Sequence, residues 1–180
     1  MLEINKNNLY EDQSPYLQQH KENPVNWQVW SKEVFDIAKE KKIPILLSIG
    51  YASCHWCHVM EHESFEDNPT ADLMNKYFLN IKVDREERPD IDFIFQSSYQ
   101  LFNQAGGGWP LTMFLDENGV PFMAGTYFPK TPLHGLPSFK EVILKIGETY
   151  KQNREEIIKQ SGIISKSLEL RKSSVLDQDL

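Results

Sequence analysis

A short apolar run followed by both cysteines of the chain limits the possible folds most strongly. Residues 43–49 form a nearly unbroken apolar segment, which is typical of a strand buried on both faces of a sheet. A turn over 50–53 follows, and a helix is expected to begin near Cys54. Cys54 and Cys57 therefore lie where a buried strand passes into a helix, and any thiol chemistry of this chain takes place there.

The rest of the chain shows alternating helix and strand patterns. The segments with helical spacing or a helix cap are 27–41, 70–78, 89–102 and the stretch from Ser138 to about 160, where Ser138 and Glu141 would form a capping box. The segments with strand patterns are 78–83 and the two arms of a hairpin, 111–115 and 120–124. This order predicts an α/β domain with a central mixed four-stranded sheet flanked by helices and a right-handed crossover between its first two strands.

The chain is expected to contain one folded domain with two less ordered ends. Residues 1–25 predict an irregular N-terminal extension, because two X-Pro pairs interrupt regular structure there. Residues 26–160 carry the helix and strand patterns and form the predicted domain. The Ser- and charge-rich residues 161–180 predict a loosely ordered C-terminal tail.

The charge of the chain argues against two classes of partner. It has 26 acidic and 19 basic residues, for a formal net charge of −7, and an acidic surface disfavours nucleic-acid backbones and anionic lipid. Residues 1–21 contain no apolar export segment, and no apolar run is long enough to span a bilayer. We therefore expect no nucleic-acid or membrane partner and a cytoplasmic location.

The position of the two thiols has a chemical reason. A helix N-terminus offers unpaired backbone N–H groups and a partial positive charge, which favour a thiolate over a thiol. Cys54 is the expected nucleophile, with a pKa well below the free-thiol value of about 8.5, and His55 and His58 would add positive charge beside it. Cys57 lies one turn further along and can attack a mixed disulfide formed at Cys54, as thiol–disulfide exchange requires.

Five segments carry a family resemblance. They are Ser-Pro-Tyr-Leu-Gln-Gln-His (14–20), Asn-Pro-Val-Asn-Trp (23–27), Ser-Ile-Gly-Tyr-Ala-Ser-Cys-His-Trp-Cys-His-Val-Met-Glu (48–61), Lys-Val-Asp-Arg-Glu-Glu-Arg-Pro-Asp (82–90) and Gly-Gly-Trp-Pro-Leu-Thr (107–112). Together they resemble the thioredoxin-like domain of the spermatogenesis-associated-protein-type family, a branch of the thioredoxin superfamily long described as a domain of unknown function. The resemblance runs from about residue 14 to 130 and implies a thioredoxin-like fold for the domain 26–160.

The resemblance implies a thiol–disulfide oxidoreductase with a redox-active centre at Cys54 and Cys57. Cys54 would attack and Cys57 would resolve. Pro110, in a cis bond after Trp109, would lie against the Cys54 sulfur and position the substrate backbone. Apart from the resemblance, the place of Trp56 between the cysteines predicts an exposed side chain that, with Trp109, would contact the substrate. The substrate would be a disulfide-containing protein or a small thiol. A recycling reductant or oxidant would be needed, and no cofactor.

Ser48 departs from the thioredoxin pattern. Many thioredoxins carry a buried aspartate six residues before the first cysteine, where it helps to move the proton of the resolving thiol, but this chain has Ser48 there. Glu61 or solvent is the expected substitute. Longer members of the family continue into a helical barrel domain. The alternative function is therefore a non-catalytic module that docks a partner, or such a domain, around Trp56, Trp109 and Pro110.

Three other interpretations of the cysteine motif compete with the redox one. Cys-x-x-Cys-His also occurs at haem attachment sites, but that chemistry requires export. Cys54, Cys57, His58 and Glu61 would share one helix face, yet structural zinc usually takes its ligands from two separated segments, so no metal is expected. An inert buried pair of cysteines is the third.

The two residues between the cysteines predict the redox poise. Thioredoxins usually carry Gly-Pro at this place, whereas this chain carries His55 and Trp56. A protonated His55 would stabilise the Cys54 thiolate, and a stabilised thiolate makes the disulfide more oxidising. We therefore expect a reduction potential above the value of about −270 mV that thioredoxin has.

Overall fold

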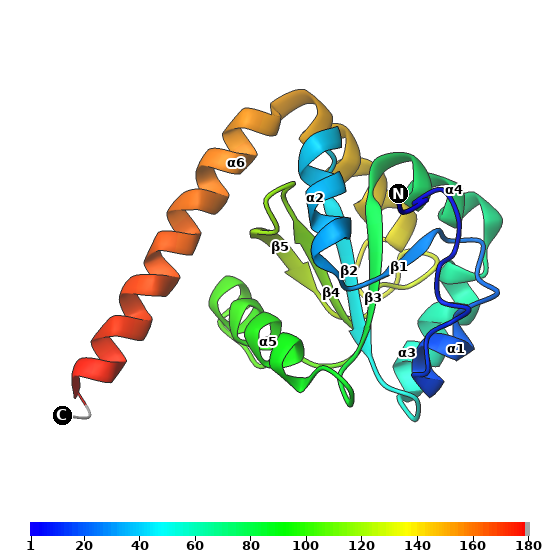
Figure 1. Cartoon of the computed structure of the whole chain (residues 1–180), viewed down its shortest axis with the longest axis horizontal. Coiled ribbons are helices and arrows are strands. Elements are labelled where there is room, and N and C mark those ends of the chain that lie inside the picture. Colours follow the sequence, from blue (N-terminus) through cyan, green and yellow to red (C-terminus); the bar gives the residue numbers. More distant parts are fainter. Residues whose placement is uncertain (179–180) are drawn as a thin grey trace.

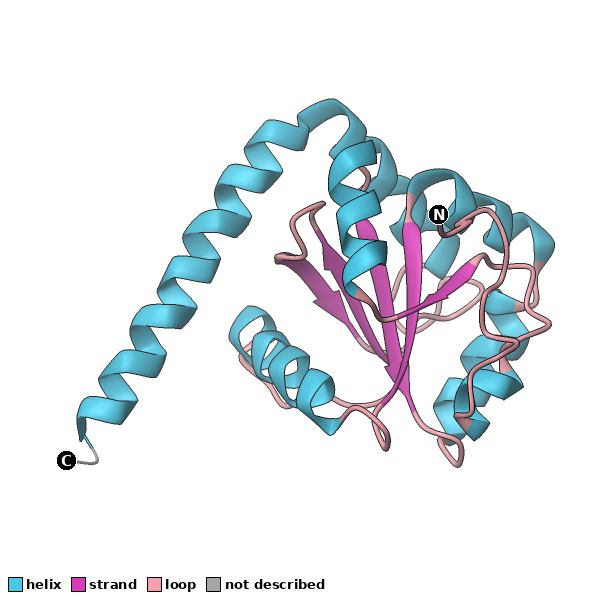
Figure 2. Cartoon of the chain, in the orientation of Figure 1, coloured by secondary structure: helices cyan, strands magenta, loops and turns pink. Residues whose placement is uncertain are grey.

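One mixed sheet forms the centre of the molecule. The computed structural model describes the backbone of residues 1–178 and the side chains of residues 1–167 and 169. Five strands lie in the order β1-β3-β2-β4-β5, with helices on both faces of the sheet (Figure 1, Figure 2). The strands are β1 (Trp27–Val29), β2 (Ile45–Gly50), β3 (Leu79–Asp84), β4 (Leu111–Leu115) and β5 (Pro121–Gly125). β3 is parallel to β1 and β2, whereas β4 is antiparallel to β2 and β5.

Helices occupy most of the chain between the strands. They are α1 (Pro15–Gln19), α2 (Lys32–Lys41), α3 (His55–Met60), the π-helical turn η1 (Glu61–Phe65), α4 (Asn68–Tyr77), α5 (Pro89–Asn103) and α6 (Phe139–Gln178). The predicted α/β architecture is confirmed, but the sheet has five strands rather than four. The predicted capping box is also present: the Glu141 N–H donates to Ser138 Oγ at 3.2 Å, and the Ser138 N–H donates to Glu141 Oε2 at 2.9 Å.

The additional strand lies where the sequence predicts the start of a helix. The spacing over 27–41 indicates one helix, and this prediction is wrong at its N-terminal end, because β1 precedes α2. The Ser31 side chain accepts the Val34 N–H at 3.3 Å and so caps α2. Trp27 and Gln28 are buried in β1, which pairs with a strand from a distant part of the chain. Such non-local pairing overrides local spacing.

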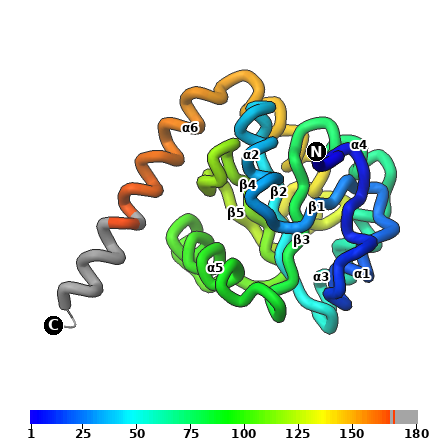
Figure 3. Tube along the Cα trace, viewed as in Figure 1, coloured from blue at the N-terminus to red at the C-terminus, as the bar shows by residue number. Residues whose placement is uncertain are grey.

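The two ends of the chain are more regular than expected. Residues 1–25 contain α1, and Tyr16 and Val25 are fully buried, so this segment contributes to the core. α6 continues past 160, with non-helical angles at Asn153 (φ −126°, ψ 32°) that kink it. Figure 3 shows α6 leading away from the sheet after the kink. The last two residues of the predicted tail, 179–180, lie outside the described residues, and the division of the chain at 26 and 160 stays a prediction.

The sheet separates two apolar clusters. Successive side chains of a strand point to opposite faces, so Leu47 of β2 packs with residues of α2 and α5, whereas Leu46 packs with residues of α3, α4 and α6. This alternation places Ser48 on the face that carries α3. In the described part of the chain no helix combines the length and the apolar character needed to cross a bilayer.

Candidate redox site

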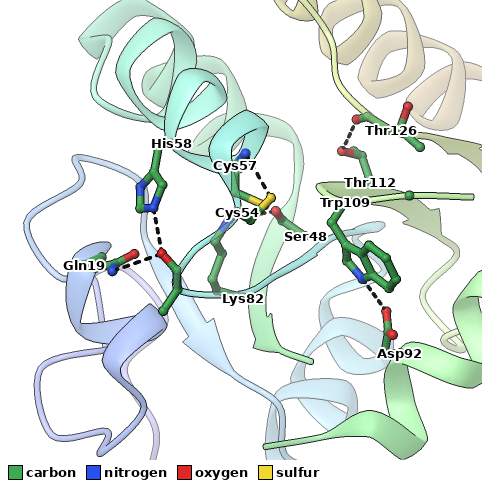
Figure 4. The surroundings of a disulfide bond; sticks show 12 residues. Gln19, Ser48, Cys54, Cys57, His58, Lys82, Asp92, Trp109, Thr112 and Thr126 are labelled. Carbon is green, nitrogen blue, oxygen red and sulfur yellow. Dashed lines mark hydrogen bonds between the residues drawn. A yellow bond between two sulfur atoms is a disulfide. The ribbon is translucent and has the colours of Figure 1, made fainter. Parts of the chain in front are cut away.

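The two cysteines form a disulfide at the beginning of a helix. Cys54 is bonded to Cys57 and is the N-cap residue of α3. The backbone N–H of Cys57 donates to the Cys54 sulfur at 3.2 Å, so an N–H group that has no partner within the helix is directed at this sulfur. The predicted position of the dithiol, between a buried strand and a helix, is confirmed (Figure 4).

The turn before α3 is held through one carbonyl group. His58 Nε2 donates to the Ala52 carbonyl oxygen at 2.7 Å, and Gln19 Nε2 of α1 reaches the same oxygen at 3.5 Å (Figure 4). His58 therefore has a structural contact of its own. His55 is exposed beside the cysteines, and the electrostatic role of both histidines stays a prediction.

An exposed aromatic residue lies between the cysteines. The Trp56 side chain is 52% exposed, as predicted, although tryptophan is usually well buried. Its ring lies 5.0 Å from that of Tyr127 and 5.5 Å from that of His55, measured between centroids. The Tyr127 hydroxyl donates to Glu63, which holds Tyr127 in place. Trp56 is thus an accessible apolar surface next to the disulfide.

Trp109 and Pro110 occupy the turn that leads into β4. Their peptide bond is cis, as predicted, and Pro110 is buried. Trp109 Nε1 donates to Asp92 Oδ1 of α5 at 2.9 Å (Figure 4). The guanidinium carbon of Arg85 lies 4.1 Å from the centroid of the indole. The indole is therefore fixed from α5 and from the end of β3. The contact between Pro110 and the Cys54 sulfur stays a prediction.

A buried lysine lies on the sheet face that carries α3. Lys82 of β3 is completely buried, and its Nζ donates to Ser48 Oγ at 2.8 Å (Figure 4). Three ring centroids lie 5.1, 4.9 and 4.5 Å from this Nζ, those of Tyr16, Trp27 and Phe65. Burial lowers the pKa of Lys82 to about 7, against the attraction of Glu61. Ser48 therefore accepts a hydrogen bond from an amine that titrates near neutral pH.

Glu61 is held by neighbouring side chains. His20 Nδ1 and Asn23 Nδ2 donate to Glu61 Oε2 at 2.9 and 3.0 Å. Burial, and secondarily the charge of Lys82, lowers the pKa of His20 to about 4, so its ring is neutral. Burial of Glu61 opposes ionisation, but the bonds from His20 and Asn23 together with Lys82 hold the pKa of Glu61 below its ordinary value. Its role in proton transfer stays a prediction.

Sequence reasoning missed three buried residues of this region: Tyr16, which lies near Cys57, and His20 and Lys82, which lie against the Tyr16 ring. Tyr16 belongs to α1 and His20 is the C-cap of that helix, inside the segment expected to be irregular, and Lys82 belongs to β3. The Tyr16 hydroxyl and the Cys57 sulfur meet at Gly50, where an added β-carbon would lie 2.7 Å from the sulfur and closer still to the hydroxyl. The available signal is that Tyr16, His20 and Lys82 all fall within the family motifs.

The arrangement of donors does not support a metal cluster. The helix-face set, one of the alternatives to the redox interpretation of the sequence, needs Glu61, whose Oε2 already accepts from His20 and Asn23. Across the residues that the structure describes, no group of three or more His, Cys, Asp or Glu side chains is arranged to hold a metal ion.

Comparison with known protein families shows to which family the chain belongs. A family model named Thioredox_DsbH and described as "Protein of unknown function, DUF255" matches residues 6–169. The chain belongs to this DUF255 family. Among curated relatives of this DUF255 chain, spermatogenesis-associated protein 20 of Homo sapiens is 44% identical over 177 residues, and an uncharacterised protein of Caenorhabditis elegans is 43% identical over 181 residues. The alignments cover 97% and 93% of the chain but span only 22% and 25% of those relatives.

A solved structure supports the fold of this DUF255 chain. The protein titled "DsbH Oxidoreductase" superposes with a TM-score of 0.51 at 17% identity, covering 71% of this chain and 85% of that one. At this level of identity the likeness concerns the fold alone. The predicted thioredoxin-like fold of the DUF255 domain is confirmed.

Proposed function

We propose that this domain is a thiol–disulfide oxidoreductase of the thioredoxin type. The observation that carries the proposal is the Cys54–Cys57 pair at a helix start, where the Cys54 sulfur accepts the Cys57 N–H at 3.2 Å. When the disulfide is reduced, the same N–H and the partial positive charge of the helix start favour a thiolate at Cys54. Cys54 is therefore the attacking thiol and Cys57 the resolving thiol.

The proposed cycle has two exchange steps. The Cys54 thiolate attacks one sulfur of a substrate disulfide; a Cys54–substrate bond forms, the substrate bond breaks, and the electron pair leaves on the second substrate sulfur. The Cys57 thiolate then attacks the Cys54 sulfur, which re-forms the Cys54–Cys57 bond and expels the first substrate sulfur as a thiolate. The substrate gains two electrons and the domain loses two. A recycling reductant restores the dithiol, and a recycling oxidant would drive the reverse direction.

The surface around the cysteines fits a substrate with an apolar part. Trp56 is exposed beside the disulfide. Trp109, the residue before Pro110, is a second, partly buried indole. A disulfide-containing protein or a small thiol is the proposed substrate class, and no cofactor takes part. The net charge of −7 supports an absence of nucleic-acid and anionic-lipid partners, and we propose a cytoplasmic location.

An insulin-reduction assay tests the function directly. Insulin is mixed with dithiothreitol, and the precipitation of the reduced insulin chains is followed with and without the domain. We expect the wild type to accelerate precipitation and the double variant Cys54→Ser/Cys57→Ser to leave it at the rate of dithiothreitol alone. Equal rates for the two folded proteins would contradict the proposal.

The exposed Trp56 also favours a second candidate, a docking module without catalysis. Its indole is 52% exposed and, with Trp109 and Pro110, could hold a partner protein or a helical barrel domain. The insulin assay separates the two functions, because a docking module would not accelerate precipitation. Loss of acceleration in Trp56→Ala with unchanged thiol reactivity would assign Trp56 to substrate contact within the redox function.

Removal of His55 tests the predicted redox poise. At pH 6 we expect His55→Ala to shift the equilibrium with glutathione toward the disulfide by about two- to fivefold, the scale of an exposed charge pair. The Cys54 pKa should rise in parallel, and the effect should shrink at pH 8, where exposed histidines are neutral. The matched control is His62→Ala, which removes an exposed histidine paired with Glu66. Equal potentials for wild type and His55→Ala at pH 6 would remove His55 from the mechanism.

A further inference from the structure

A buried tyrosine hydroxyl without a partner lies next to the resolving cysteine. Tyr16 is completely buried, and its hydroxyl has no hydrogen-bond partner among the residues that the structure describes. The hydroxyl and the Cys57 sulfur approach each other at Gly50 of β2, where the absence of a side chain leaves the space. Unpaired buried polar atoms are uncommon in folded proteins and call for an explanation.

The position of Tyr16 is set by several contacts. Ser14 caps α1 by accepting the Leu17 N–H at 3.1 Å, and its own hydroxyl donates to Asp84 Oδ2 at 2.7 Å. The Tyr16 ring packs edge-on against His20, with centroids 4.8 Å apart. The ring therefore belongs to a fixed part of the core. These contacts keep the hydroxyl near Cys57, although the hydroxyl itself makes no hydrogen bond.

The oxidation state of Cys57 decides whether this hydroxyl has an acceptor. In the disulfide the Cys57 sulfur is uncharged and is a weak acceptor. A thiolate at Cys57 is a charged acceptor, and hydrogen bonds to charged groups are the strong ones. Burial, together with the negative charges of Glu61 and Asp84, holds the pKa of Tyr16 well above its ordinary range. The hydroxyl therefore keeps its proton and acts as a donor.

We propose that Tyr16 is a further catalytic residue, whose hydroxyl donates a hydrogen bond to the Cys57 sulfur once the disulfide is open and so stabilises the resolving thiolate. This inference rests on the redox function proposed above. In the resolving step the Cys57 thiol releases its proton to solvent, and the thiolate electron pair forms the bond to the Cys54 sulfur. The bond between Cys54 and the substrate breaks, and its electron pair leaves on the substrate sulfur. Tyr16 keeps its proton throughout and lowers the cost of forming the thiolate.

Other charged and titratable groups face the same region from each element packed against it. The charges of Glu61 of η1 and Asp84 of β3 act on Tyr16, the Nζ of Lys82 of β3 lies 5.1 Å from its ring centroid, and His20, the C-cap of α1, packs against the ring; His55 and His58 belong to the same helix as Cys57. All of them remain in a Tyr16→Phe variant, which removes only the hydroxyl oxygen and keeps the ring. A comparison of the proteins with Tyr16 and with Tyr16→Phe therefore measures the effect of the hydroxyl while the surrounding charged groups stay the same.

The decisive measurement is the ionisation of Cys57 in the full chain. In a Cys54→Ser background Cys57 is the single thiol, and its ionisation is followed by the ultraviolet absorbance of the thiolate as a function of pH, which does not require a reagent to reach the buried sulfur. We expect Tyr16→Phe to raise the midpoint by about one pH unit, a tenfold change that matches the loss of one hydrogen bond to a charged group. An unchanged midpoint in the folded variant would overturn the proposal.

The matched control is Tyr150→Phe, which removes a buried tyrosine hydroxyl that contacts Glu117. We expect it to lower stability and leave the Cys57 midpoint unchanged, whereas Tyr16→Phe should leave the stability of the disulfide form unchanged. A loss of stability in Tyr16→Phe without a shifted midpoint would assign Tyr16 a structural role only.

A second measurement does not depend on the folding of a variant. In the wild-type protein the NMR signal of the Tyr16 hydroxyl proton should move downfield on reduction, and an unmoved signal would overturn the proposal. Neither measurement uses a disulfide substrate. Failure of insulin reduction with a shifted midpoint would thus defeat only the proposed function, and normal reduction with an unshifted midpoint would defeat only the role of Tyr16.

Discussion

Replacing Cys57 with serine is expected to stop turnover at a covalent intermediate. Cys54 can still attack a substrate disulfide, but the serine hydroxyl is not ionised at neutral pH and does not resolve the mixed disulfide. We expect insulin reduction to fall by at least about a thousandfold, the scale on which the loss of a catalytic nucleophile acts. When the reduced variant is freed of dithiothreitol before the substrate is added, the adduct between Cys54 and the substrate should accumulate and be visible on a non-reducing gel and by mass spectrometry.

The reciprocal variant is the control for the order of attack. Cys54→Ser leaves Cys57, which is 1% exposed and lies against Tyr16 and Gly50. This variant should lose turnover to the same extent but form no adduct. An adduct through Cys57 in the Cys54→Ser protein would show that the assigned roles are reversed. Cellular proteins that stay bonded to Cys54 of the Cys57→Ser variant would also identify the natural substrate.

The neutral, buried His20 is expected to make the fold sensitive to mild acid. Its pKa in the folded protein is about 4, whereas an unfolded chain has the ordinary value of about 6.5. Between these two pH values the unfolded chain binds a proton that the folded protein does not bind. The free energy of unfolding should therefore be fully retained above pH 6.5 and fall by about 3 kcal/mol as the pH is lowered to 4.

Urea denaturation between pH 7 and 4 measures this loss. His20→Asn keeps an amide near the position of Nδ1, so it should be less stable at pH 7 but nearly independent of pH across the same window. The control His62→Asn changes an exposed histidine and should retain the slope of the wild type. Lys82, whose pKa is about 7, titrates only at the upper edge of this range, and Glu61, whose pKa is held below its ordinary value, adds a loss only near its lower edge; both groups remain in His20→Asn. An undiminished slope in His20→Asn would rule out His20 as the cause.

Local patterns predicted most of the secondary structure and, within the site, the position of Cys54 and Cys57 at the start of a helix. The apolar run before Cys54 is β2, and the residues that follow the first cysteine form a helix, because burial and capping act over a few residues of the chain. The spacing over 27–41 misled at Trp27, since apolar residues at this spacing also suit a short strand followed by a helix. The end of α6 was placed near 160, where no local signal indicates that the helix continues.

The parts that sequence alone establishes are those in which the interacting residues are neighbours in the chain. Cys54 and Cys57 are three residues apart, and their place at a helix start follows from the segments on either side. The cis bond at Pro110 was expected only from the family resemblance. The surroundings of Cys57 were decided by tertiary structure, because Tyr16, Gly50 and Lys82 come from α1, β2 and β3 and meet only when the sheet is assembled. A hydroxyl or an amine acquires an altered pKa and an unusual partner only when folding removes it from water, and spacing along a chain carries no record of that burial.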